Sequence, residues 1–365
     1  MAALGAAPAL AVNPAPAPPV AVAKCASYGN QEVLAALSEM FDRLGGLGRI
    51  VRGKTVTVKL NLTGHPGSRV EGLPLGLTHY SHPATAAALA HLLGREGARR
   101  VRFVESCSGT AGPLEEFLLN AGWNVRNLVS AAPRVEFENT NGLGTGRRYT
   151  RFRVPGGGYV FSAYELNAAY DDTDVLVSLA KLKQHETCGV TLSLKNLFGI
   201  TPASVYGDDA GAGRPNEEPS KGRLDVLHHG KRQPSASAPA ERDPASSRDP
   251  GYRVPRIVAD LAAARPVDLA IVDGIRAIAG GEGPWIQGVR PVSPGVLIAG
   301  TNAVTTDAVS AAVMGYDPSA DRGTAPFTRC DNTLRLAESL GIGSTDLKRI
   351  EVMGVPIAQA LYRFG

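Results

Sequence analysis

The segment KLKQHETCGVTLSLKNLFGITP, residues 181–202, concentrates the side chains best suited to chemistry. If its first residues are extended, side chains that alternate with a period of two place Lys181, Lys183 and His185 on one side. A helix predicted to begin near Thr187 would follow them directly. Two lysines and a histidine in front of a positive helix N-terminus favour an anionic ligand, such as a phosphate, a carboxylate or a polyanion.

The predicted helix carries a polar stripe of Thr187, Thr191 and Lys195, spaced at i, i+4 and i+8. Because the helix is otherwise apolar, we expect Lys195 and the following Asn196 to point inward at a ligand. The alternative is a basic turn in solvent, since lysine near a helix start is common at protein surfaces. His185 is the candidate acid or base, because the ordinary pKa of histidine lies near neutrality.

Three acidic residues, Asp273, Glu282 and Asp307, could hold a divalent metal or orient polar groups of a substrate. Glu282 lies in the loop GGEGP, whose bare backbone at Gly283 would let a ligand approach closely. The alternatives are that Asp273 caps a turn and that Glu282 is solvated. The seven histidines show no H-E-x-x-H or other tight ligand spacing, so spacing gives no support to a metal held by distant residues.

The elements that must position these groups alternate between β-rich runs and helical patterns. The predicted strands are residues 20–24, 55–60, 101–105, 175–179, 267–273 and 296–300. The predicted helices are residues 31–44, 83–96, 114–121, 190–198, 254–264 and 303–314. The runs TVTVKL, VLVSL and VDLAIVD are nearly all apolar or β-branched, as in strands that are buried on both faces.

This alternation, with right-handed crossovers, predicts an α/β fold with a mostly parallel sheet or sheets flanked by helices. The helices and strands could form one body or two lobes with a cleft. In such sheets ligands bind beyond the carboxyl ends of the strands. Lys59 and Asn61, at the end of the second predicted strand, are therefore expected to join the anion site.

Composition limits the class of protein. Of the 365 residues, 44% are apolar and 20% are charged, which is typical of a soluble globular chain. The net charge of +4 is too small and too scattered for a nucleic-acid binder, and no apolar run could span a bilayer.

The four cysteines, Cys25, Cys107, Cys188 and Cys330, lie far apart without a C-x-x-C pair. No iron–sulfur cluster held by this chain alone is therefore expected. In an exported protein they could form up to two disulfides, whereas in the cytosol they should stay reduced.

Two stretches stand apart from the predicted domain, residues 20–365. Residues 1–19 lack a basic start and read either as the remnant of a signal peptide or as a disordered Ala/Pro tail. The first alternative predicts export to the periplasm, the second a cytoplasmic protein. Residues 207–255 hold seven prolines, eight acidic and eight basic residues, which predicts a flexible, disordered insertion in the domain.

Several blocks of the chain resemble DUF362, a family defined as a domain of unknown function. The blocks are VTVKLNL at residues 56–62, residues 78–98, residues 181–202 with KNLFG, residues 271–288 with VDG and EGP, and residues 295–318. The resemblance covers most of the chain and implies the α/β fold and the location of the site. Some relatives carry an added ferredoxin-type cysteine run, which this sequence lacks, and others carry twin-arginine export signals.

The leading functional hypothesis is an enzyme, or an enzyme-like binder, for a small anionic substrate bearing a phosphate or a carboxylate. Its predicted catalytic residues are His185 and Lys195. Its predicted substrate-binding residues are Lys59, Asn61, Lys181, Lys183, Thr187, Asn196 and Gly283. The predicted metal ligands are Asp273, Glu282 and Asp307. The rival hypothesis is a non-catalytic module that docks through residues 207–255 on a partner in a redox or cofactor-maturation system, and a third is a structural metal protein.

Overall fold

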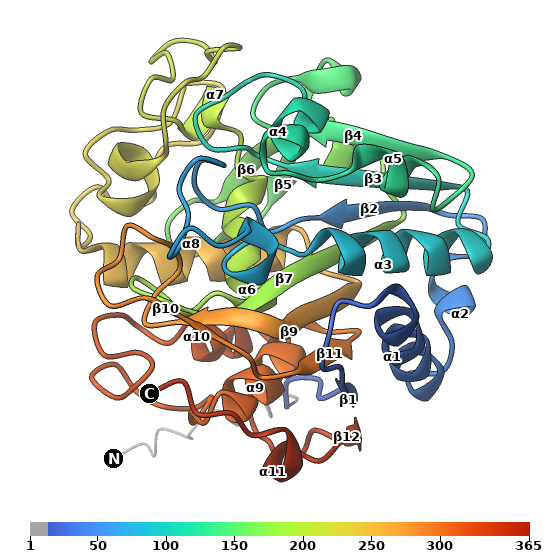
Figure 1. Cartoon of the computed structure of the whole chain (residues 1–365). Coiled ribbons are helices and arrows are strands. Elements are labelled where there is room, and N and C mark those ends of the chain that lie inside the picture. The colour runs from blue at the N-terminus through green and yellow to red at the C-terminus, as the bar shows by residue number, and fades with distance from the viewer. Residues whose placement is uncertain (1–13) are drawn as a thin grey trace, which may run out of the picture.

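One large mixed sheet separates two layers of helices (Figure 1). The computed structural model describes residues 14–365, so the predicted N-terminal tail or signal remnant lies mostly outside the described residues. The sheet contains β1 (Val20–Lys24), β2 (Thr55–Lys59), β3 (Arg100–Glu105), β4 (Val135–Asn139), β7 (Val175–His185), β8 (Gly189–Val190), β9 (Leu269–Ala279), β10 (Arg290–Val292), β11 (Val296–Gly300) and β12 (Val352–Gly354). A separate ribbon pairs β5 (Tyr149–Arg153) with β6 (Ala163–Asn167).

The strand order is β12-β1-β11-β9-β7-β2-β3-β4, with β10 added to β9 and β8 added to β7. The five strands from β9 to β4 are mutually parallel, whereas β11 runs antiparallel to both β9 and β1. The prediction of an α/β fold with a mostly parallel sheet is confirmed. All six predicted strands are present, because their apolar and β-branched runs are buried on both faces.

Helices cover both faces of the sheet. They are α1 (Asn30–Arg43), α2 (Leu47–Val51), α3 (Pro83–Arg95), α4 (Leu114–Asn120), α5 (Val125–Val129), α6 (Leu192–Asn196), α7 (Ala203–Tyr206), α8 (Pro250–Ala264), α9 (Ala303–Val313), α10 (Thr333–Ser339) and α11 (Ile357–Ala360). Successive side chains of β7 alternate between the two layers. Val177 and Leu179 join the core under α1 and α3, whereas Leu176 and Ala180 join the core under α6, α8 and α9.

The chain changes direction across the sheet between β2 and β7. From β2 it steps outward to β3 and β4, with α3 in one layer, and from β7 it steps the other way to β9, with α8 in the opposite layer. Parallel sheets leave a crevice beyond the carboxyl ends of the strands at such a switch point. The topology therefore places a site where β2 and β7 end.

The segment 207–249 follows a defined path, so the structure does not show the disorder that its composition predicts. Its one element is a π-helical turn, Leu224–His228, and α8 begins at Pro250, before the end of the predicted insertion. Val226 and Leu227 are buried in the core. The buried carboxylate of Glu241 pairs with the guanidinium of Arg253 on α8. The segment has no periodic apolar face. It is held instead by an ion pair and by a few buried apolar side chains.

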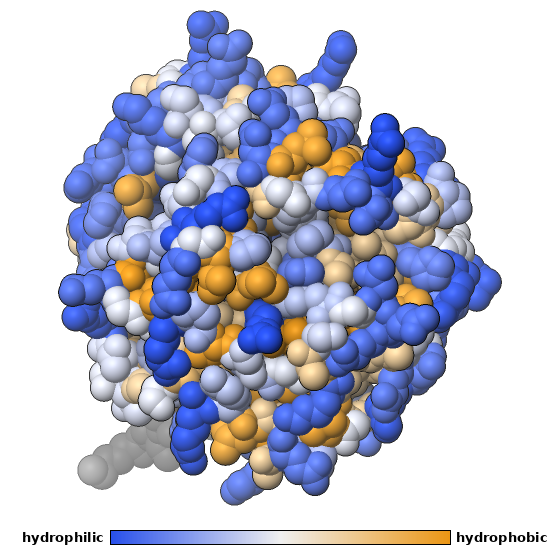
Figure 2. Space-filling view, in the orientation of Figure 1, coloured by the Kyte–Doolittle hydropathy of each residue, from blue (hydrophilic) through white to orange (hydrophobic). Residues whose placement is uncertain are grey.

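The surface seen in Figure 2 is mostly polar, with apolar side chains in small separate groups. Within residues 14–365, no helix is both long enough and apolar enough to cross a membrane. The four cysteines are buried thiols without a disulfide bond.

Candidate functional site

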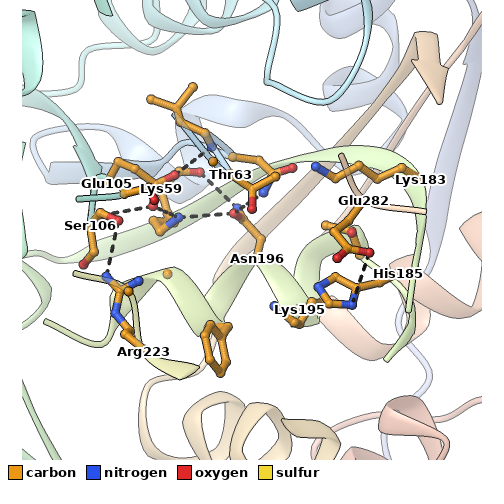
Figure 3. Close-up of a pocket in the computed structure, with 18 of the residues that line it drawn as sticks. Lys59, Thr63, Glu105, Ser106, Lys183, His185, Lys195, Asn196, Arg223 and Glu282 are labelled. Atoms are coloured by element: carbon orange, nitrogen blue, oxygen red, sulfur yellow. Dashed lines mark hydrogen bonds and ion pairs between the residues drawn. The ribbon is translucent and has the colours of Figure 1, made fainter. Parts of the chain in front are cut away.

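A pocket of about 390 Å³ lies beyond the carboxyl ends of β2, β3 and β7 (Figure 3). Its walls come from five parts of the chain: these strand ends, the start of the β9–β10 loop, α6 and the 3₁₀ turn Leu197–Ile200, residues 62–64, and the segment 222–228. Its charged side chains are Lys59, Lys183, Lys195, Arg223, Glu105 and Glu282. Four basic groups against two carboxylates make the pocket attractive to anions.

Lys59 and Glu105 form a buried ion pair in the pocket wall, with 2.6 Å between Nζ and Oε1. Lys59 also donates to the carbonyl of Leu60 at 2.7 Å and to Oδ1 of Asn196 at 3.2 Å. The Glu105 carboxylate accepts the backbone N–H of Leu62 at 2.8 Å. All three N–H donors of Lys59 therefore have acceptors within the protein. Lys59 stabilises the pocket wall and does not offer a free charge to a ligand.

Asn61 and Asn196 bridge β2 and α6. The side-chain amide of Asn61 donates to Oδ1 of Asn196 at 3.2 Å, and the amide of Asn196 donates to Ser178 at 3.0 Å. Asn61 lines the pocket, and its Oδ1 is buried and accepts no hydrogen bond from residues 14–365. A buried acceptor without a donor is costly, so a ligand donor would be favoured there.

Lys183 is wholly buried and donates to the carbonyl of His79 at 2.7 Å, its one acceptor among the described residues. No carboxylate of the described chain lies within ion-pair distance. Burial lowers the pKa of Lys183 well below its usual value; Glu282 opposes this effect, and Lys181 and Lys195 add to it. Figure 3 shows its amine turned into the pocket. An anion beside it would supply the missing counter-charge.

His185 and Glu282 lie side by side in the pocket, with 3.8 Å between Nδ1 and Oε2 (Figure 3). His185 lies in the hairpin between β7 and β8, and its Nδ1 accepts the backbone N–H of Thr187 at 3.1 Å. Burial lowers the pKa of His185 well below its usual value, against the opposing charge of Glu282. At neutral pH the ring is therefore uncharged and carries its proton on Nε2.

Glu282 is held as a carboxylate. It accepts the backbone N–H of Glu186 at 3.0 Å and the indole N–H of Trp285 at 3.1 Å. Burial acts to raise the pKa of Glu282, but the charge that His185 carries when it is protonated, these two donors and the charge of Lys195 outweigh it, so the pKa falls to about 2. Trp285 itself is 48% exposed and lies at the pocket mouth.

Lys195 enters the pocket from α6. Its Nζ lies 4.2 Å from the ring centroid of Phe198, a cation–π contact. Burial lowers the pKa of Lys195, with Cys188 and Glu282 opposing and Lys59 and Arg223 adding to the effect. Figure 3 places Lys195 next to His185.

Arg223 and His228 belong to the segment predicted to be a disordered insertion, and sequence reasoning missed both. Arg223 donates to the carbonyl of Thr201 at 2.8 Å and to Oδ1 of Asn141 at 2.8 Å. The carbonyl of Arg223 lies 3.3 Å from Nδ1 of His228, and burial lowers the pKa of that histidine to about 4. Only spatial proximity identifies these two residues, since their stretch has no motif.

Lys181 does not line the pocket, in contrast to the prediction. It is paired with Asp273, its register partner on the neighbouring β9, at 3.3 Å. Its Nζ also donates to the hydroxyl of Tyr28 at 2.8 Å and to the carbonyl of Gly76 at 2.7 Å. Asp273 accepts the hydroxyls of Tyr28 at 2.9 Å and Thr85 at 3.2 Å. The pair forms a closed, buried network beside the pocket.

Asp307 also serves the fold and lies outside the pocket lining. Its two carboxylate oxygens accept the backbone N–H groups of Ser193 at 2.8 Å and Leu194 at 2.7 Å, at the start of α6. Burial raises the pKa of Asp307 to about 8 against these two donors. The prediction that α6 begins near Thr187 is wrong, because the N–H of Thr187 turns back to His185 and the helix starts only at Leu192.

The three predicted metal ligands are not brought together: Asp273 is ion-paired, Asp307 caps α6, and only Glu282 reaches the pocket. Within residues 14–365, no group of three or more histidine, cysteine, aspartate or glutamate side chains is arranged to hold a metal ion. Gly283 does not line the pocket either. A Cβ there would lie 2.3 Å from the Trp285 ring, so the missing side chain makes room for the indole instead of a ligand.

Two comparisons of the sequence with known proteins identify relatives. The model of the family described as "Domain of unknown function (DUF362)" matches residues 56–312. The thylakoid-associated protein sll1697 of a Synechocystis species is 26% identical over 327 residues, which cover 89% of this chain and 80% of that protein.

Two solved structures are more distant. A crystal structure of a protein from Thermotoga maritima is 14% identical, with a TM-score of 0.36, over 73% of this chain. The lactate racemase apoprotein of Thermoanaerobacterium thermosaccharolyticum is 11% identical, with a TM-score of 0.37, over 76% of this chain. The chain spans about half the length of these two proteins, 55% and 54%.

Proposed function

The chain belongs to the DUF362 family, and we propose that its pocket binds a small anionic substrate that bears a carboxylate or a phosphate. The observation that carries this proposal is the wholly buried amine of Lys183, which has one carbonyl acceptor among the described residues and faces the pocket. Lys195 and Arg223 reinforce the positive potential from two other walls. Buried charges are normally paired, so a bound anion supplies the missing partner.

His185 is the proposed proton carrier of the reaction. With Nδ1 facing Glu282 and the N–H of Thr187, its Nε2–H can hydrogen-bond to a substrate oxygen while the ring is neutral. Once the ring has taken up a second proton, the imidazolium can transfer the Nε2 proton to that oxygen and later recover it. The neighbouring carboxylate of Glu282 stabilises the imidazolium formed when His185 takes up a proton instead. This geometry supports proton transfer on a bound anion.

The experiment is a thermal-shift titration of the full chain with phosphate, sulfate, pyruvate and malonate. We compare wild type with Lys195→Met, Lys183→Met and the surface control Lys348→Met. A ligand at one hundred times its Kd should stabilise the wild type and the control by about 2.7 kcal/mol. The two pocket variants should lose most of that shift. Equal shifts in all four proteins, or none in any, would contradict the proposal.

The rival function, docking on a redox or maturation partner through residues 207–255, makes a different prediction for that segment. Arg223 and His228 line the pocket, which favours the role of a pocket wall. Replacing both with alanine should weaken the anion response while leaving any partner complex intact. A pull-down complex that is lost on these substitutions, with the anion response unchanged, would favour the rival.

A further inference from the structure

Lys195 differs from the buried lysines Lys59 and Lys181 in having no fixed partner. Lys59 is paired with Glu105 and Lys181 with Asp273. Lys195, which is only half-buried, lies in the pocket, and within residues 14–365 its Nζ has neither a hydrogen-bond acceptor nor a carboxylate within ion-pair distance. It is therefore the amine that a ligand can reach without breaking an existing contact.

The surroundings of Lys195 suit an amine that reacts as well as one that binds. Burial and the nearby charges of Lys59 and Arg223 lower the pKa of Lys195, which increases the fraction of the amine in the uncharged, nucleophilic form. The face of Phe198, 4.2 Å from Nζ, attracts a cation and would equally stabilise the cation that forms when the nitrogen is incorporated into an iminium. Figure 3 shows His185 beside it.

We propose that Lys195 forms an imine with the carbonyl carbon of an oxo acid bound in this pocket. The proposal rests on the proposed function, because the carboxylate of the oxo acid is the anion that Arg223 and Lys183 attract. The uncharged Nζ attacks the carbonyl carbon to give a carbinolamine. The nitrogen then loses its two protons, the former carbonyl oxygen leaves as water, and the C=N bond forms. No oxidant or reductant is needed, because the two protons lost by the nitrogen leave with the oxygen, and His185 takes up one of them as imidazolium and passes it to the departing oxygen.

The consequence for the substrate is activation at the carbon next to the imine. A protonated imine withdraws electrons, so a proton or a carboxylate on that carbon leaves more readily than from the free oxo acid. Lys195 is the covalent group in this scheme, and His185 is the acid and base. The substrate class is therefore a carboxylate with a ketone or an aldehyde, small enough for a pocket of about 390 Å³.

The experiment traps the imine. The full chain is incubated separately with glyoxylate, pyruvate, 2-oxobutyrate and acetoacetate, and then reduced with sodium borohydride. Intact mass should increase by one acid less one oxygen atom, and peptide mapping should place the adduct on Lys195. Lactate, which has no carbonyl, should give none. Lys195→Arg, which keeps the charge, should lose the adduct, and Lys348→Arg should retain it.

The outcomes separate the two proposals. Absence of an adduct at Lys195 with all four oxo acids, or labelling of exposed lysines to the same extent, overturns the imine. If the same acids still stabilise the wild type in thermal shift, anion binding stands and only the imine fails. If Lys195→Arg does not fold, the location of the adduct in the wild-type peptide map decides alone.

Discussion

Lys59 and Lys183 are both wholly buried in the wall of one pocket, yet replacing each with methionine should change stability in opposite directions. Lys59 is paired with Glu105 at 2.6 Å and has two further acceptors. Lys183 has the carbonyl of His79 and no carboxylate partner among the described residues. Lys59→Met leaves the buried carboxylate of Glu105 without its counter-charge. Lys183→Met removes a buried amine whose charge is poorly compensated.

The structure sets the size of both effects. Removing one member of a buried ion pair costs about 3–5 kcal/mol, which is the expected loss for Lys59→Met. Burying the charge of Lys183 cannot cost more than deprotonating an ordinary lysine at pH 7, about 5 kcal/mol, because the amine would otherwise lose its proton. This value is the upper limit of the stability gained by Lys183→Met. The carbonyl of His79, left without its donor, costs about 1–3 kcal/mol, so the net gain is at most about 2–4 kcal/mol, and we expect a value at the lower end, about 2 kcal/mol.

Thermal and urea unfolding at pH 7, without added anions, measures these changes. The entropy of unfolding of a chain of this length is about 0.8 kcal/mol/K, so Lys59→Met should lower Tm by about 4–6 °C and Lys183→Met should raise it by about 2–3 °C. The surface variant Lys348→Met should stay within about 1 °C of the wild type. If Lys183→Met destabilises the protein as much as Lys59→Met does, Lys183 is not an uncompensated charge and the reasoning fails.

Three further predictions concern other parts of the pocket. Gly199→Ala would place a Cβ 2.7 Å from Nζ of Lys59 and should cost about 1–3 kcal/mol in urea unfolding, whereas Gly213→Ala, with open space around it, should be neutral. Because the pKa of His228 falls to about 4 in the folded state, the unfolded chain alone takes up this proton between pH 6.5 and pH 4; stability should fall as pH falls, by up to roughly 3 kcal/mol, and His228→Gln should flatten that slope. Bound phosphate or pyruvate should change the fluorescence of Trp285 at the pocket mouth, and a Trp285→Phe variant that still shows the change would refute this placement.

The strands and the edge of the sheet that holds the site could be predicted from the sequence. Runs such as TVTVKL identify a strand buried on both faces, and the rule for carboxyl ends then locates Lys59 and Asn61 at the pocket. The pocket also brings together Lys183 and His185 from β7, Lys195 from α6 and Glu282 from the loop after β9. These predictions depend on local patterns, which a single sequence contains.

Partners that depend on which strands are neighbours could not be predicted. Lys181 precedes Lys183 by two residues, but its partner is Asp273, and nothing local shows that β7 and β9 are adjacent in that register. The sequence gives a weak indication that Glu105 belongs to the site, since it is the last residue of a predicted strand. It gives none for Arg223, because the segment around Arg223 lacks periodicity and is positioned by contacts with distant residues.

The helix that carries Lys195 has no capping side chain of its own, and this dependence extends across the chain. Asp307 on α9 accepts the first free N–H groups of α6 from 114 residues further along. Leu192, at the start of α6, adopts a left-handed φ of 45°, a conformation that its own side chain disfavours. We therefore expect α6 to be poorly held in a nascent chain that ends before α9, and C-terminal truncations that remove Asp307 should loosen the pocket although they leave its lining residues in place.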